Sequence, residues 1–125
     1  MRITLNCIIL FVQDVETLKA FYVDNFNLEL AEEVKSEWAL LKAGACELGL
    51  HKIGAEYLSA IKIPAKFDNN TKIVFEIDED IFAFHKKLKD KKITIKDIKT
   101  WDNYSYLVCD GEDPEGNVFQ LRMKK

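Results

Sequence analysis

Apolar and polar positions along the chain follow two different periods. Residues 3–12 (ITLNCIILFV) are apolar and rich in β-branched side chains, which predicts a strand. Apolar residues then recur at helical spacing from Val15 to Phe26, so a helix is expected over about 15–25, with Asp14 placed to cap its first turn. Three shorter runs of strand character follow at 28–34, 38–42 and 46–52.

The second half of the chain repeats this order. A strand is predicted at 72–77, a helix beginning within 78–80, and further strands at 93–98, 104–109 and 117–123. Residues 53–70 contain Pro64 and a polar run that ends at Asn70, which predict a connection without regular structure. The order of elements repeats at an offset of about 65 residues, which indicates a duplication whose halves are each too small to bury a sheet alone.

Side chains alternate between the two faces of a strand, and four of the predicted strands have one wholly apolar face. These four strands are 3–12, 46–52, 72–77 and 117–123. Their apolar faces are expected to pack under the helices. The opposite faces are mixed. If they curve together they line a trough for a small molecule, and otherwise they meet solvent. The candidate ligand-binding residues on these mixed faces are Cys7, Ile9, Phe11, Glu47, His51, Lys72, Glu76, Gln120 and Arg122.

Composition narrows the classes of protein that fit. The 125 residues suit one domain, and 48% apolar with 31% charged residues allows a packed core. The formal net charge of -3 argues against a nucleic-acid partner. The longest apolar run, Cys7 to Val12, is far shorter than the roughly 20 residues that span a bilayer. A cytoplasmic protein without a membrane partner is expected. Three widely spaced cysteines predict neither a disulfide framework nor a structural zinc site.

A motif near the end of the chain resembles a known family. Asp113-Pro114-Glu115-Gly116-Asn117, followed by Val-Phe-Gln-Leu, is similar to the last hairpin of the vicinal oxygen chelate superfamily, which includes glyoxalases, bleomycin-resistance proteins and extradiol dioxygenases. The opening Val12-Gln13-Asp14, the following Phe21-Tyr22 and the run 44–51 (GACELGLH) are similar to the first module of that family.

This resemblance covers essentially the whole chain. It implies an α+β fold in which two tandem βαβββ modules form a curved mixed sheet. Residues 1–125 would be a single glyoxalase-like domain, with a first module over about 1–54, a connection over 55–70 and a second module over about 71–125. The resemblance also implies a homodimer.

Metal-dependent members of the family typically place four His or Glu ligands on the inward faces of the first, fourth, fifth and eighth strands. The corresponding positions here are Cys7, Gly49 (or Glu47 if the register moves by two), Lys72 and Gln120. Glycine has no ligand atom, a lysine ammonium repels a cation, and the glutamine offers only a neutral oxygen. We therefore expect neither a metal nor another cofactor, as in bleomycin-resistance-type binding proteins.

The mixed faces carry charged and aromatic groups that suit an anionic or aromatic ligand. Lys72 and Arg122 could attract a carboxylate or a phosphate, or they could form internal ion pairs with Glu76 or Glu47. Four aromatic side chains could stack on a planar ligand, or they could serve packing or a dimer interface; these are Trp38, Trp101, Tyr104 and Tyr106.

Three functional hypotheses follow from the sequence. The first is a protein that binds or sequesters a small organic molecule in the sheet cavity without a metal. The second is a lyase or isomerase of the superfamily, metal-independent or with an atypical metal site, that uses Lys72, Glu76 or His51 for acid–base chemistry. The third is a non-catalytic structural or regulatory dimer whose trough is filled by its own side chains.

Overall fold

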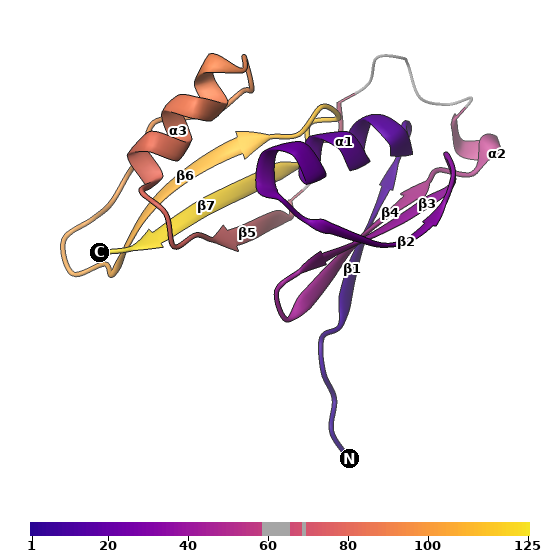
Figure 1. The fold of residues 1–125 in the computed structure, drawn as a ribbon, viewed down its shortest axis with the longest axis horizontal. Helices are drawn as coiled ribbons and strands as arrows, with labels where there is room; N and C mark the ends of the chain where they lie inside the picture. The colour runs from indigo at the N-terminus through magenta and orange to yellow at the C-terminus, as the bar shows by residue number, and fades with distance from the viewer. Residues whose placement is uncertain (59–65, 69) are drawn as a thin grey trace. The chain divides into compact units, whose positions relative to one another are not determined.

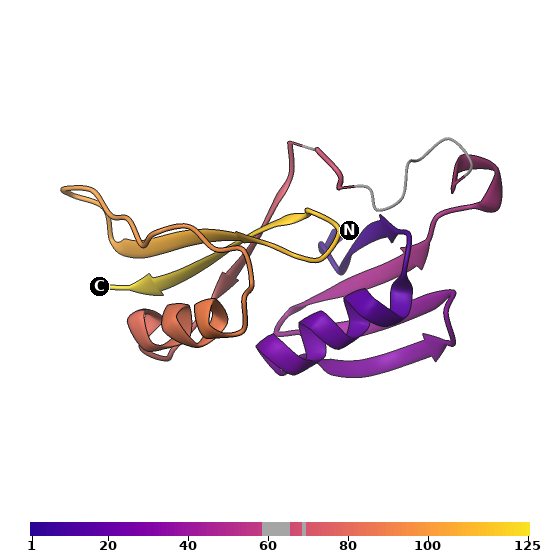
Figure 2. The same cartoon turned by 90° about the horizontal axis from the view of Figure 1, so that it is seen from above.

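Two β-sheets, each packed against one longer helix, make up the fold (Figures 1 and 2). The computed structural model describes residues 1–58, 66–68 and 70–125. The chain divides into two units, Met1–Ala65 and Lys66–Lys125. The first holds a four-stranded sheet and the second a three-stranded sheet, both mixed, which confirms the α+β class.

The first unit follows the order that the sequence predicts. Its elements are β1 (Cys7–Val12), α1 (Val15–Phe26), β2 (Glu29–Val34), β3 (Trp38–Ala43), β4 (Cys46–Lys52) and the short α2 (Ala55–Leu58). The sheet has the strand order β1-β4-β3-β2, with β1 parallel to β4 and the other pairs antiparallel.

The first strand begins at Cys7 and not at residue 3 as predicted. Cys7 pairs with Glu47 near the start of β4, and the Glu47 backbone N–H donates to the Asn6 carbonyl at 2.8 Å. Because β4 begins at Cys46, β1 has no pairing partner before Cys7 among the described residues. Residues 1–5 therefore extend beyond the sheet (Figure 1).

Helix α1 begins where its cap predicts. The Asp14 carboxylate accepts from the Thr17 backbone N–H at 3.0 Å and from the Thr17 hydroxyl at 2.8 Å, and these bonds lower the pKa of Asp14. Val15, Leu18 and Tyr22 are buried on the side of α1 that packs against β3 and β4. The helix is therefore held by burial of this apolar stripe.

The second unit contains β5 (Lys72–Glu76), α3 (Ile81–Asp90), β6 (Tyr106–Glu112) and β7 (Val118–Lys124). The strand order is β5-β7-β6, with β5 parallel and β6 antiparallel to β7. The Asp80 carboxylate caps α3 by accepting from the Phe82 N–H at 2.9 Å. Helix α3 packs against β7 and buries Ile81 and Leu88 (Figure 2).

The strand predicted at 93–98 is wrong. Only two isolated bridges join this region to β6, one between Ile95 and Gly111 and one between Lys99 and Val108. Between these bridges the chain advances four residues from Ile95 to Lys99, whereas β6 advances three residues between Val108 and Gly111. One extra residue therefore interrupts the ladder. The alternation of Ile93 and Ile95 is broken in the same place, because the next apolar residue is Ile98. The second half is therefore βαββ rather than βαβββ, and residues 93–104 are called the edge segment below.

The β6–β7 hairpin is organised around a buried carboxylate. Asp113 accepts from the backbone N–H groups of Glu115 at 2.9 Å and Asn117 at 3.0 Å, and from the Asn117 side-chain amide at 2.9 Å. Gly116 adopts a φ of 83°, which glycine reaches without steric cost. The motif thus fixes the register of the whole hairpin, beginning with the pair Glu112 and Val118.

The connection predicted over 53–70 begins with α2, and Pro64 lies outside the described residues. Among the residues described, no helix has the length and apolar character that crossing a membrane requires.

Replacing Asp113 with alanine should destabilise the second unit by roughly 2–4 kcal/mol, because buried backbone donors lose their acceptor. The measurement is the urea midpoint of unfolding followed by circular dichroism. The control is Asp102→Ala, which removes a carboxylate from an exposed position in the edge segment. Equal midpoints for the two variants would contradict this role of Asp113.

Candidate functional site

Each sheet has one face under its helix and one open face, as the alternation predicts. In the first unit Val12, Leu48 and Leu50 are buried. The open face pairs Cys7 with Glu47, Ile9 with Gly49 and Phe11 with His51 across the parallel β1–β4 ladder. The candidate residues of the first unit therefore share one surface.

An aromatic cluster occupies this surface. The His51 ring lies 5.4 Å from the ring of Phe11 and 6.0 Å from that of Trp38, between ring centroids. Trp38 lies so close to the sheet that a Cβ on Gly49 would come within 2.6 Å of its ring, so this position requires glycine. Phe11 is 62% exposed and Ile9 47% exposed, so the surface is apolar and open on the described unit.

The open face of the second unit is charged, and its centre is Asp110. The Lys72 ammonium donates to Asp110 Oδ2 at 2.8 Å, and the Gln120 side-chain amide donates to Asp110 Oδ1 at 3.0 Å. Burial alone would raise the pKa of Asp110, but these hydrogen bonds and the charges of Lys72 and Lys96 lower it below its ordinary value. The carboxylate is therefore ionised and shared between β5 and β7.

Asp110 was missing from the residues predicted for the site. It lies opposite Gln120 in the β6–β7 ladder, as the third pair outward from the Asp113–Asn117 turn. The turn motif therefore contained the signal that would have placed Asp110 beside Gln120.

A second charged group surrounds Arg122. Its guanidinium donates to Glu76 Oε1 from Nε at 3.0 Å and from Nη2 at 2.9 Å, and its Cζ lies 4.2 Å from the centre of the Tyr106 ring. Arg122 therefore forms the internal ion pair with Glu76 that was one of the alternatives predicted from the sequence. Lys72 also forms an internal pair, but with Asp110 rather than with Glu76 or Glu47.

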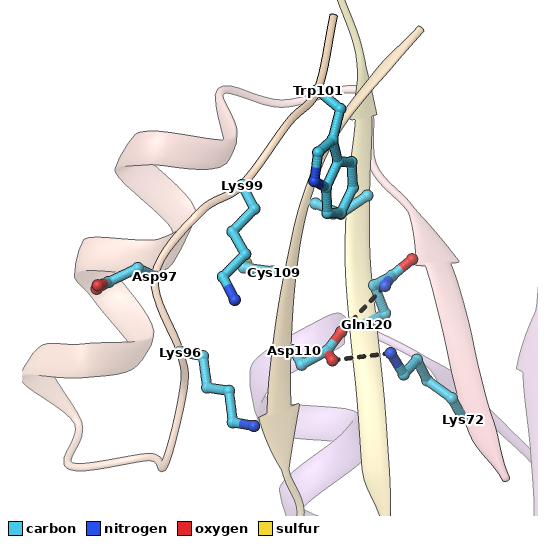
Figure 3. A pocket seen from close by; sticks show the side chains of 9 residues that line it. Lys72, Lys96, Asp97, Lys99, Trp101, Cys109, Asp110 and Gln120 are labelled. Atoms are coloured by element: carbon cyan, nitrogen blue, oxygen red, sulfur yellow. Dashed lines mark hydrogen bonds and ion pairs between the residues drawn. The ribbon is translucent and has the colours of Figure 1, made fainter. Parts of the chain in front are cut away.

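A cavity of about 160 Å³ opens between β6 and the edge segment in the second unit (Figure 3). The ammonium groups of Lys96 and Lys99 point toward β6, whereas the Asp97 carboxylate points the opposite way, toward α3. Two of the predicted site residues, Lys72 and Gln120, belong to this pocket. The complete lining is Lys72, Lys96, Asp97, Lys99, Trp101, Val108, Cys109, Asp110 and Gln120.

The cysteines near these surfaces are protonated at neutral pH. Burial raises the pKa of the Cys109 thiol to about 11, and burial also raises the pKa of Cys7. Since the thiolate is the reactive form, neither side chain has the character of a catalytic nucleophile.

A family model for the glyoxalase/bleomycin resistance protein/dioxygenase superfamily matches residues 4–121. The chain belongs to this superfamily. Among curated protein sequences, none matches it.

Several solved structures of this superfamily fold are similar over nearly the whole chain. A lactoylglutathione lyase from Agrobacterium tumefaciens has a TM-score of 0.72 and 19% identity, over 96% of this chain and 92% of its own. The fosfomycin resistance protein FosX from Listeria monocytogenes has a TM-score of 0.77 and 15% identity, over 100% and 96%. An integron cassette protein from the mobile metagenome of V. cholerae has a TM-score of 0.73 and 20% identity, over 100% and 98%. At these identities the likeness concerns the fold alone.

Three of the residues at positions where the family resemblance implies metal ligands, Gly49, Lys72 and Gln120, have groups unsuited to a divalent cation, which leaves Cys7 and, if the register moves by two, Glu47. In the first unit, Gly49 has no ligand atom and Trp38 covers it. In the second, Lys72 carries a positive charge and Gln120 turns its amide nitrogen toward Asp110. Across residues 1–58, 66–68 and 70–125, no group of three or more His, Cys, Asp or Glu side chains is arranged to hold a metal ion.

The lowered pKa of Asp110 predicts a pH-dependent contribution to stability. The unfolded carboxyl has a pKa of about 3.9, so the stabilisation is present above about pH 4 and is lost as the pH falls through the lower folded pKa. Asp110→Asn should unfold at lower urea than the wild type at pH 7, and the difference should shrink below pH 4. Asp102→Asn is the control. A difference that stays constant from pH 7 to pH 2 would contradict this assignment.

Proposed function

We propose that this protein binds a small organic molecule on the open sheet face of its second unit, without a metal ion, and sequesters it without transforming it. The observation that carries the proposal is the contact of Lys72 and Gln120 with one carboxylate, Asp110. Those two side chains stand at positions where the family resemblance implies metal ligands.

The electrostatics of this group favour a ligand over a cation. The Lys72 ammonium already neutralises Asp110, so a divalent ion placed there would meet a positive charge at close range. The adjoining pocket combines apolar surface from Trp101, Val108 and Cys109 with charged and polar groups that can orient a small molecule.

The enzymatic alternative needs an acid–base group on an open sheet face. The contacts that these candidate groups make favour binding over catalysis. Lys72 is held by Asp110 and Glu76 by Arg122. His51 donates from Nδ1 to the Lys52 carbonyl at 2.8 Å, since a carbonyl can only accept. A general base must reach the proton that it abstracts, and Lys72 and Glu76 are each turned toward an ion-pair partner within their own unit, whereas the Nδ1 bond of His51 does not engage its Nε2.

A homodimer belongs to the same proposal, because the family resemblance implies one. Its support in this chain is the N-terminal segment, where Met1, Ile3 and Leu5 are strongly exposed next to β1 at the edge of its sheet. Edge strands without charges are usually covered in native assemblies.

The metal content of the purified protein tests the first half of the proposal. Protein prepared without chelators should contain far less than one equivalent of Ni, Zn, Fe or Mn by elemental analysis, because the donor set is unsuitable. Its melting temperature should not change with EDTA. One tightly held equivalent per chain, or a lower melting temperature in EDTA, would overturn the metal-independent assignment.

A thermal-shift panel tests the second half. Neutral and anionic aromatic compounds, simple carboxylates and phosphates are compared, because a ligand at about 100 times its Kd stabilises the folded form by about 2.7 kcal/mol. At least one class should raise the melting temperature, and Lys72→Met should abolish the rise. Lys86→Met, an exposed lysine paired with Asp90 on α3, is the control. A panel without any stabilising compound would refute the binding function.

A further inference from the structure

The edge segment places two lysines on one side of the sheet where a regular strand would separate them. In a strand, residues three apart face opposite ways. The interruption between the bridges at Ile95 and Lys99 removes this alternation. Lys96 and Lys99 accordingly both point toward β6 (Figure 3). An extra residue in a strand edge is a common means of redirecting a side chain.

We infer that this pocket selects a small aromatic carboxylate, with the anionic group held by Lys96 and Lys99 and the ring against Trp101. The inference rests on the proposed function and names the class of ligand that the site takes. The sequence already placed Trp101 among the aromatic side chains that could stack on a planar ligand, whereas neither Lys96 nor Lys99 was among the predicted site residues.

The positive charges of the pocket outnumber the negative charges, because its lining contains Lys72, Lys96 and Lys99 together with Asp97 and Asp110. Lys72 forms a salt bridge with Asp110, so that pair is neutral. Among the residues that the structure describes, the Lys96 and Lys99 ammonium groups have no hydrogen-bond or salt-bridge partner, and Asp97 points away from them. Because Asp110 is already neutralised, it does not repel an incoming anion, and a carboxylate between Lys96 and Lys99 would gain charge-assisted hydrogen bonds.

The remaining walls of the pocket favour a planar ring. Trp101 is 57% exposed, and its ring is held edge-to-face by Tyr104 at 5.5 Å between centroids. Val108 adds an apolar surface beside it. The cavity of about 160 Å³ is close to the roughly 150 Å³ cavity that holds one benzene ring. One ring with one anionic group therefore matches the size as well as the chemistry.

Three matched compounds separate charge from ring shape. The protein carries only two tryptophans, so a Trp38→Phe background leaves Trp101 as the single indole reporter. Benzoate should change its fluorescence saturably, with an affinity that falls as NaCl rises. Benzamide, which lacks the charge, should bind about tenfold or more weakly. Cyclohexanecarboxylate, which lacks the planar ring, should also bind more weakly than benzoate.

Variants assign the effect to particular residues. Lys96→Gln and Lys99→Gln should each weaken benzoate binding about tenfold. Lys86→Gln removes the same charge from α3 and should leave binding unchanged. Trp101→Leu, followed by calorimetry, should weaken benzoate more than cyclohexanecarboxylate. Equal affinity for benzamide and benzoate, or an unchanged affinity in Lys99→Gln, would overturn the inference.

Failure of the ligand class is distinguishable from failure of the proposed function. If benzoate does not bind while neutral compounds in the thermal-shift panel stabilise the chain, the class is wrong and the binding function stands. If no compound in the panel stabilises the chain, both are wrong.

Discussion

The carboxylate of Asp110 links all three strands on the open face of the second unit. It lies on β6, accepts from Gln120 on β7 and reaches Lys72 on β5. Two donors on one carboxylate keep it ionised and leave Lys72 without free charge. The distribution of charge on this face follows from the contacts of Asp110 with Lys72 and Gln120. The centre of the sheet is electrically balanced, and the net positive charge of the pocket comes from the edge segment.

The two halves share their order of elements except for the strand that follows the helix, but their open faces have different chemistry. The first unit carries an aromatic cluster on an apolar surface, with Trp38 lying against Gly49. The second carries ion pairs, and the edge segment stands where the first unit has β2, between the helix and the next strand. Both units therefore pack the apolar faces of their sheets under helices, whereas the open faces are not constrained by the core and can differ.

Much of the fold was predictable because burial imposes a period on the sequence. The apolar stripe of α1 and the capping residue Asp14 predicted the start of that helix at Val15. The start of α3 at Ile81 was predicted to within a few residues, next to its cap Asp80. The edge segment was mispredicted because Ile93 and Ile95 satisfy a two-residue period before Ile98 breaks it. The site was only partly predictable for a related reason. The alternation of side chains along a strand predicts which residues share a surface. The partner of Lys72, however, depends on the register of β6 against β7, which the hairpin motif fixes.

Charge balance links Lys72 to Asp110 on the open face of the second unit. Asp110 requires a cation, and Lys72 supplies it at 2.8 Å. A carboxylate in place of Lys72 would set two negative charges at salt-bridge distance, which raises the pKa of one of them or demands a bound cation. A lysine and a metal ion are thus alternative solutions to the same electrostatic requirement. With the ammonium present, a divalent ion at this face would have to overcome its repulsion and also break the Gln120 hydrogen bond, and this cost supports the proposal of a site without a metal.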